Sequence, residues 1–220
     1  MRSEHFQVPS RAFGDLRDVT VLVPDDYLKR RRRYPVLYLH DGAADWLGRG
    51  GLCSAIESAA CPPFLTVMPA PVNRTREYKL DERHLRFMTE DLVPWVDAHL
   101  RTRRDAAHRA VHGVSLGGLC AVALGLRHPE VFGAAGGQGG AFWYARRRIV
   151  REARSSAGCT TRFHLVCGRL DGNLDDNRAL RDALTEAGIV HVYEEGRGKH
   201  SWPFWHRTLP SALQTYFSRC

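Results

Sequence analysis

The sequence has no long hydrophobic run. Its start, MRSEHFQVPSRAFGDL, lacks the apolar core of a signal peptide, and no stretch approaches the roughly 18 apolar residues of a membrane helix. The six cysteines include no C-x-x-C pair, and no compact group of cysteine and histidine has the spacing of metal ligands. We therefore expect a cytoplasmic protein with reduced thiols, no membrane partner, no metal and no cofactor.

Acidic residues are the minority among the charged ones. Lys and Arg number 32 against 24 Asp and Glu, which gives a formal net charge of +8. A net positive charge of this size is compatible with binding to nucleic acid, to an anionic membrane surface or to an acidic small substrate. The only dense basic runs, at 29–33 and 146–148, lie in no recognisable nucleic-acid module, so we expect no nucleic-acid partner. A solvated basic surface is the simplest interpretation, and an anionic substrate is the alternative.

Strand-like and helix-like segments alternate along the chain. This alternation predicts one α/β domain over residues 1–220, a mostly parallel sheet with helices on both faces. Ligands of such sheets bind beyond the carboxyl ends of the strands. Strands are predicted at 18–23, 34–40, 64–70, 109–115, 132–140, 162–168 and 189–196, and helices at 51–60, 85–100 with a bend or restart at Pro94, 116–128, 175–188 and 208–218.

The segment GVSLG at 113–117 matches G-x-S-x-G between a predicted strand and a predicted helix. Its glycines permit a tight turn that exposes the Ser115 hydroxyl at the start of the helix. Backbone N–H groups and the helix dipole there favour a developing oxyanion. The pattern predicts a nucleophile, and a glycine-rich turn with a capping serine is the alternative.

A serine nucleophile needs a base, and the base needs an orienting carboxylate. The chain order serine, acid, histidine of α/β-hydrolases points to Asp171 and His200, because each follows a predicted strand. Asp175 and Asp176 are rival acids, but they begin a helix and are more simply N-terminal capping charges.

Several segments together resemble the esterase D-type branch of α/β-hydrolases, and most closely its enterochelin (enterobactin) esterase-like group. They span about residues 34–210 and read YPVLYLHDGAADW, NRTREY, HGVSLGG, GQGGAFWY, CGRLDGNLDDNRAL and GKHSWPFWHRTLP. The resemblance implies an α/β-hydrolase fold in which Ser115, Asp171 and His200 are nucleophile, acid and base. It also implies an oxyanion hole made by the backbone N–H groups of Leu116 and Ala43. The family's usual LLDG is LHDG here, which places His40 near the site.

Arginine and aromatic side chains beside the strand ends are candidate substrate contacts. Arg74 and Arg76 could bind anionic or catecholate oxygens, or could form surface ion pairs with Glu77 or Asp81. Aromatic rings could stack on a substrate, although such residues are more often core. The aromatic candidates are Trp46, Trp143 and Trp202, together with Phe142.

These patterns predict a serine ester hydrolase that forms an acyl-enzyme. The favoured substrate is an anionic aromatic ester such as a catecholate siderophore trilactone. An acyltransferase or thioesterase would use the same triad, and differs in how well water is excluded. A non-catalytic binding module on a hydrolase scaffold is the alternative of another class.

Overall fold

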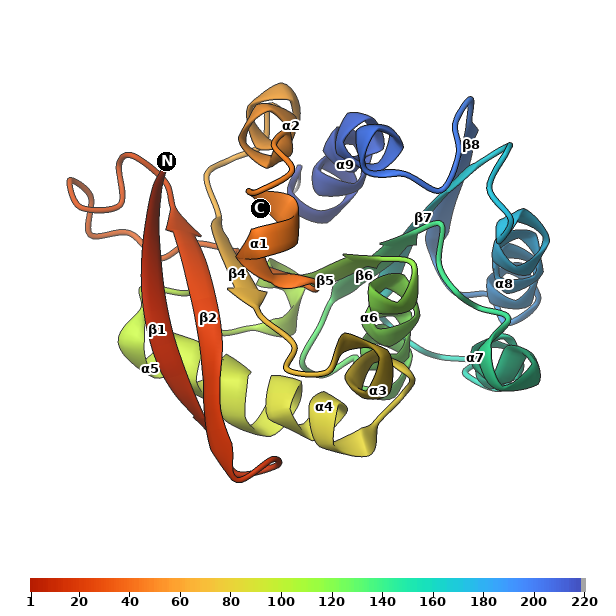
Figure 1. The fold of residues 1–220 in the computed structure, drawn as a ribbon, viewed down its shortest axis with the longest axis horizontal. Coiled ribbons are helices and arrows are strands. Elements are labelled where there is room, and N and C mark those ends of the chain that lie inside the picture. Colours follow the sequence, from red (N-terminus) through yellow and green to blue (C-terminus); the bar gives the residue numbers. More distant parts are fainter. Residues whose placement is uncertain (219–220) are drawn as a thin grey trace.

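The computed structural model describes residues 1–218 and contains an eight-stranded sheet in the order β1-β2-β4-β3-β5-β6-β7-β8 (Figure 1). Strands β3 to β8 are parallel, whereas β1 and β2 are antiparallel to their neighbours. The predicted mostly parallel sheet is therefore confirmed. The strands are β1 (Arg2–Ser10), β2 (Asp15–Val23), β3 (Val36–Leu39), β4 (Leu65–Pro69), β5 (Arg109–Val114), β6 (Ala134–Gln138), β7 (Arg162–Gly168) and β8 (His191–Gly196).

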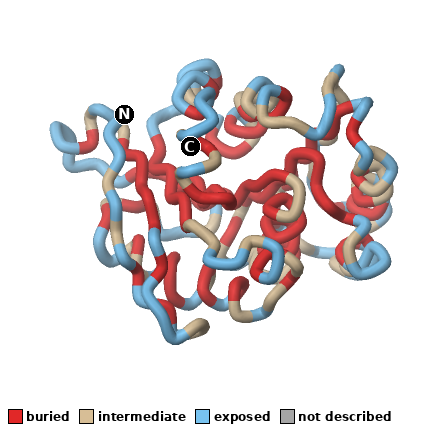
Figure 2. The backbone as a smooth tube through the Cα atoms, viewed as in Figure 1, coloured by how far each residue is buried: buried red, intermediate tan, exposed pale blue. Residues whose placement is uncertain are grey.

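Helices cover both faces of the sheet, and each face buries its own apolar cluster. The central strands are buried along their length, as Figure 2 shows, because helices exclude water from both sides. One face carries α3 (Arg74–Tyr78), α4 (Glu82–Arg86), α5 (Val93–His99), α6 (Leu116–Arg127), α7 (Tyr144–Arg154) and α8 (Leu174–Glu186). The other carries α1 (Gly42–Trp46), α2 (Leu52–Ser58) and α9 (Trp202–Phe217).

Strand β1 was not predicted, because its sequence RSEHFQVPS is mostly polar. Only Val8 and Ser10 are buried in it. The strand is held by antiparallel pairing with β2 along its whole length, from Arg2 opposite Val23 to Ser10 opposite Asp15. Strand pairing of this kind depends on the partner and leaves little trace in the sequence of an edge strand.

Two predicted helices differ from the structure at their ends. The helix predicted at 85–100 begins earlier as α4, passes through a π-helical stretch (Phe87–Leu92) and continues as α5. Pro94 lacks an N–H, so it cannot make the usual backbone bond to the preceding turn. The C-terminal helix begins at Trp202 rather than Thr208, with Pro203 in its first turn, where a missing N–H costs nothing.

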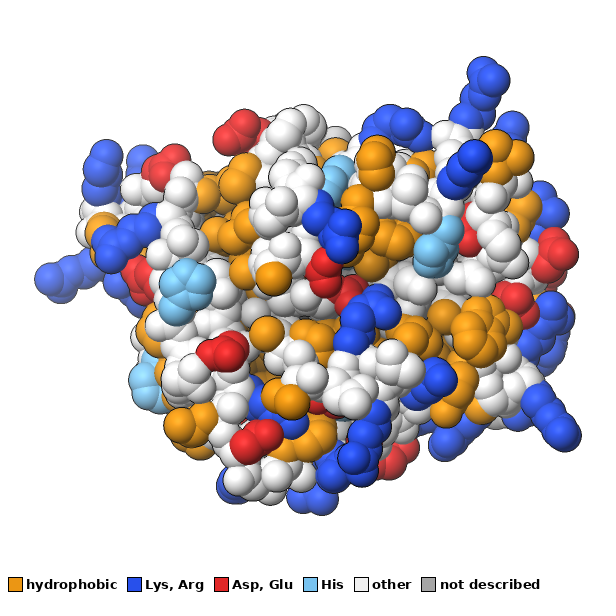
Figure 3. Space-filling model, in the orientation of Figure 1, with side chains coloured by type: hydrophobic (Ala, Val, Ile, Leu, Met, Phe, Trp, Pro, Cys, Tyr) orange, Lys and Arg blue, Asp and Glu red, His pale blue; other side chains and the backbone are white. Residues whose placement is uncertain are grey.

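Basic side chains are spread over the surface, and Figure 3 shows them scattered across the visible face. The two dense basic runs, 29–33 and Arg146–Arg148, are both exposed. Many arginines form ion pairs, for example Arg147 with Asp176 at 2.7 Å. Within residues 1–218, no helix is both long enough and apolar enough to cross a bilayer.

His164, in β7, is buried, and we expect it to make stability sensitive to acid. Its side chain is 0% exposed, its Nδ1 lies 2.8 Å from Thr215 Oγ1, and burial lowers its pKa to about 4. In the unfolded chain this pKa is about 6.5, so the stabilisation is full above pH 6.5 and is lost as the pH falls towards 4. The difference corresponds to about 3 kcal/mol. We expect wild type to lose about that much more unfolding free energy than His164→Gln between pH 7 and pH 4.

Urea unfolding at a series of pH values measures this difference. His99→Gln, at an exposed position, is the matched control and should follow wild type. Parallel stability curves for wild type and His164→Gln would contradict the assignment.

Candidate active site

The candidate site lies at the carboxyl ends of the parallel strands. Ser115 directly follows β5, Asp171 follows β7, His200 follows β8, and Ala43 follows β3 in the first turn of α1. Ser115 and His200 together line two clefts, of about 300 Å³ and 320 Å³. The sheet thus brings together residues that are far apart in the sequence, as expected for this class of fold.

Ser115 occupies a strained backbone conformation at the start of α6. Its φ is 55° and its ψ is −118°, a combination that residues with a side chain rarely adopt. The neighbouring structure holds it there, because its N–H donates to Gln138 O at 3.0 Å and its carbonyl accepts from Ala141 N at 2.9 Å. A Cβ at Gly113 would lie 2.4 Å from the backbone of Gly117, so the turn requires glycine at this position. The turn places the side chain of Ser115 at the mouth of both clefts.

Asp171 and His200 form a hydrogen-bonded pair. His200 Nδ1 donates to Asp171 Oδ2 at 2.8 Å, and the other carboxylate oxygen accepts from Asn173 N at 2.9 Å. The carboxylate is 1% exposed, which fixes the imidazole against a rigid partner. Asp175 instead lies 3.7 Å from Arg178, and Asp176 pairs with Arg147, so neither rival acid contacts His200. Because Nδ1 is engaged by Asp171, Nε2 is the ring nitrogen of His200 that can accept a proton.

Gly139 packs directly against this pair, so a substitution there can change the geometry of Asp171 and His200 without changing either residue. Its φ is +55°, and a Cβ there would lie 2.5 Å from Asp171 Oδ2 and 3.1 Å from His200 Nδ1. Gly139→Ala should therefore displace the imidazole without removing any functional group. We expect kcat to fall by about 100-fold, the cost of a misplacement near 1 Å. Steady-state kinetics on an aryl ester measures the effect.

Gly172→Ala is the matched control, since a Cβ at Gly172 meets nothing within 4 Å although the residue adjoins Asp171. It should retain most activity. Equal losses in both variants would show that the contact of Gly139 with the pair is not the cause.

The loop after β3 is held by side chains of α3 and α1. Asp41 has a φ of 81°, its N–H donates to Tyr78 Oη at 2.8 Å, and its buried carboxylate accepts from Arg74 Nε. Burial raises the pKa of Asp41 to about 6, while the charge of Arg74 and its hydrogen bond oppose that rise. Arg74 Nη2 also lies 3.4 Å from Val114 O, so this one side chain joins the loop to the serine turn. The N–H groups of Ala43 and Leu116 lie in the first turns of α1 and α6 and have no intrahelical acceptor.

The candidate binding residues occupy different environments. Arg74 and Trp202 line the 300 Å³ cleft, and Trp143, which is 48% exposed, lines the 320 Å³ cleft. Arg76 lies on the surface 4.0 Å from Asp81, the ion pair that the sequence left open. Trp46 is fully buried and donates from Nε1 to His40 O at 2.6 Å, a core environment.

Other cleft residues were not singled out from the sequence. The sequence around Arg49 contains no motif that indicates a binding role. Arg49 lies just after α1 and lines the 300 Å³ cleft, where its guanidinium carbon is 5.3 Å from the ring centroid of Trp202. Trp205 packs edge-on against His200 with ring centroids 4.9 Å apart. It was missed because the C-terminal helix was predicted to begin at Thr208, after this residue, whereas α9 begins at Trp202.

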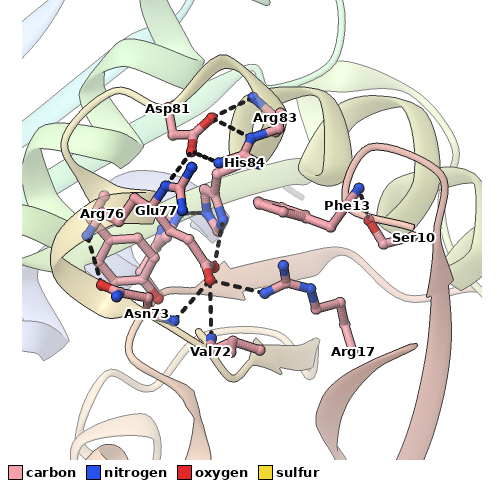
Figure 4. A network of polar contacts seen from close by, with 12 residues as sticks. Ser10, Phe13, Arg17, Val72, Asn73, Arg76, Glu77, Asp81, Arg83 and His84 are labelled. Atoms are coloured by element: carbon pink, nitrogen blue, oxygen red, sulfur yellow. Dashed lines mark hydrogen bonds and ion pairs between the residues drawn. The ribbon is translucent and has the colours of Figure 1, made fainter. Parts of the chain in front are cut away.

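The NRTREY segment organises a polar network behind the loop that follows β3. Figure 4 shows Glu77 accepting hydrogen bonds from the backbone of Val72 and Asn73 and pairing with Arg17 and His84. Burial opposes ionisation of Glu77, but the hydrogen bonds from His84, Asn73 and Arg17 prevail and lower its pKa to about 2. The segment therefore contains a buried carboxylate whose partners favour its charged form, together with the two residues that hold Asp41.

The sequence of this chain matches that of a known protein family. The family model described as "Putative esterase" matches residues 10–216. The chain belongs to this esterase family. The match covers the serine turn and the segments with Asp171 and His200, and the predicted esterase resemblance is confirmed.

Individual proteins are similar to this chain in sequence or in fold. The chain is 27% identical over 94% of its length to an endo-1,4-beta-xylanase/feruloyl esterase of Xylanibacter ruminicola, of which it spans 30%. The enterochelin esterase of Shigella flexneri superposes with a TM-score of 0.86 at 22% identity, over 98% of this chain and 58% of that one. A ferulic acid esterase superposes with a TM-score of 0.85 at 20% identity, over 99% and 97%. These structures show a common α/β-hydrolase fold, as predicted.

Proposed function

We propose that this esterase hydrolyses a carboxylic ester through an acyl-enzyme on Ser115. The observation that carries the proposal is the strained serine between two clefts that both also contain His200, whose Nδ1 is fixed by Asp171. Strain at such a position persists only where the surrounding structure enforces it, and it is common at reacting groups.

The chemistry follows from this geometry. Ser115 Oγ attacks the ester carbonyl while His200 Nε2 takes the hydroxyl proton, and the Asp171 carboxylate stabilises the imidazolium. The N–H groups of Leu116 and Ala43 bind the oxyanion, and removal of one such donor typically costs about 3 kcal/mol. His200 then returns the proton to the leaving alkoxide. In the second half-reaction, a water molecule that gives its proton to His200 attacks the acyl-enzyme, and the proton passes to Ser115 Oγ as the acid is released.

The clefts favour an aromatic ester with anionic or phenolic oxygens. One cleft presents Arg49 and Arg74 beside Trp202 and Trp205, and the other presents Trp143 and Asn173. Guanidinium groups donate to phenolate and carboxylate oxygens, and indole rings stack on aromatic ones. The similarity to enterochelin esterase supports a catecholate trilactone, and the feruloyl esterase relative supports a hydroxycinnamoyl ester as the second candidate.

Product analysis by mass spectrometry tests the proposal. The purified protein and its Ser115→Ala variant are each mixed with a catecholate trilactone, its ferric complex, methyl ferulate and an aryl acetate. Cleavage of the trilactone by wild type alone supports siderophore hydrolysis, whereas faster cleavage of methyl ferulate supports the second candidate. Cleavage that survives in Ser115→Ala would exclude Ser115 as the nucleophile.

The same experiment separates hydrolysis from acyl transfer. With an added alcohol or amine acceptor, a hydrolase releases mainly the free acid, whereas an acyltransferase yields the acceptor's ester or amide. A protein that converts none of the substrates and is not labelled at Ser115 by a fluorophosphonate probe would be a binding module instead.

A further inference from the structure

Behind the oxyanion loop, the interior holds three side chains with metal-binding atoms. His40 follows β3, His84 lies in α4 and Cys120 lies in α6. A ring nitrogen of each histidine and the sulfur of Cys120 lie within 4.8 Å of one another. The three residues are 0%, 2% and 0% exposed. They are not used by the catalytic mechanism proposed above.

The two imidazole rings are oriented like those of metal ligands. His40 Nε2 and His84 Nε2 face each other at 3.2 Å, while His40 Nδ1 lies 3.3 Å from His112 O and His84 Nδ1 lies 3.5 Å from Glu77 Oε2. A histidine that binds a metal through one nitrogen generally donates its other N–H to a carbonyl or a carboxylate. Here both outer nitrogens face such oxygens, and both inner nitrogens face a common point.

A count of hydrogens shows that two neutral imidazoles cannot satisfy all three contacts of the cluster, so it needs either a further proton or a metal ion. The contact between the rings and the two contacts to oxygen each need one hydrogen, which makes three. Two neutral imidazoles carry one N–H each. If both Nδ1 atoms donate to their oxygens, two nitrogen lone pairs face each other inside a region from which water is excluded. A cation between them converts this repulsion into two bonds.

We propose that His40 Nε2, His84 Nε2 and Cys120 Sγ bind a zinc-like divalent transition-metal ion. Two imidazoles and a thiolate are donors that suit Zn²⁺, whereas Mg²⁺ and Ca²⁺ require oxygen ligands. Binding replaces the S–H bond of Cys120 by a metal–sulfur bond and releases one proton to solvent.

The ion would act as a structural clamp. His40 immediately precedes Asp41, which begins the oxyanion loop, and Cys120 lies on the helix that starts next to Ser115. The ring of Tyr78 packs edge-on against both imidazoles, with centroids 4.9 Å and 5.1 Å away, and its hydroxyl accepts from Asp41 N–H. The ion would therefore join β3, α4 and α6 directly behind the loop.

Cobalt substitution tests the proposal without using activity. The untagged protein is freed of metal with a chelator, titrated with Co²⁺ and followed in the near-ultraviolet, where a thiolate ligand gives a charge-transfer band. We expect one equivalent of Co²⁺ with this band in wild type, its displacement by Zn²⁺, and a rise in melting temperature with either ion. Elemental analysis of the purified protein measures the resident metal.

Variants localise the site and distinguish it from the other histidines of the chain. Cys120→Ala removes the sulfur band, and Cys167→Ala, a buried cysteine in β7, keeps it. His84→Gln weakens Co²⁺ binding by at least tenfold. A folded wild type that takes up no Co²⁺, or whose bound Co²⁺ shows no thiolate band, would overturn the proposal and leave a proton shared by the two imidazoles. Since wild type alone can give that result, a variant that fails to fold does not prevent a decision.

Discussion

Ser115→Ala should lose nearly all turnover, with kcat lower by about 10⁵-fold or more, because the proposed acyl-enzyme forms on the hydroxyl that this change removes. Ser115→Gly should lose as much activity yet unfold at a higher urea concentration than wild type. Glycine adopts the conformation with φ 55° and ψ −118° without a steric penalty, and we expect about 1 to 2 kcal/mol of added stability from released strain. Pre-steady-state kinetics and urea unfolding measure the two effects.

The alanine variant is the control for the glycine variant. Ser115→Ala removes the hydroxyl but retains the Cβ, so its unfolding free energy should stay close to that of wild type. Equal stabilisation by alanine and glycine would place the origin of the effect in the lost hydroxyl rather than in the backbone. Residual activity well above the buffer rate in either variant would argue for another nucleophile.

Asp171→Asn should reduce kcat by about 10⁴-fold with little change in KM. The amide cannot hold the His200 Nδ1–H tautomer as the carboxylate does, and it cannot stabilise the imidazolium that forms when Ser115 is deprotonated. Because the carboxylate is 1% exposed, solvent does not replace it. Kinetics of acyl-enzyme formation on an aryl ester is the direct measurement.

The rival acids provide matched controls for this substitution. Asp175→Asn and Asp176→Asn change the same charge in the following helix, where the two side chains pair with surface arginines. Both variants should keep kcat within about fivefold, since such ion pairs contribute less than about 1 kcal/mol. If Asp176→Asn lost activity as Asp171→Asn does, the assignment of the acid would be wrong.

The order of elements followed from local patterns in the chain. Strands such as β5 and β7 are short apolar runs bounded by turns, and α8 is followed, directly after its C-cap Ala187, by Gly188, whose φ is +67°. These signals are contained in a few neighbouring residues. Several elements escaped prediction: the short helices α1 and α3, helix α7, and β1. Strand β1 depends on a distant partner, because it is held by its pairing with β2.

For the site, sequence alone determined the serine turn, because G-x-S-x-G between a strand and a helix is a local requirement of the backbone. It also determined the order of Ser115, Asp171 and His200 at the ends of strands. Only the tertiary structure decided that Asp171 contacts His200, that Arg74 holds Asp41, and that His40, His84 and Cys120 meet in the interior. These contacts join residues that the sheet and its helices bring together from distant parts of the chain, and no spacing in the sequence encodes such a meeting.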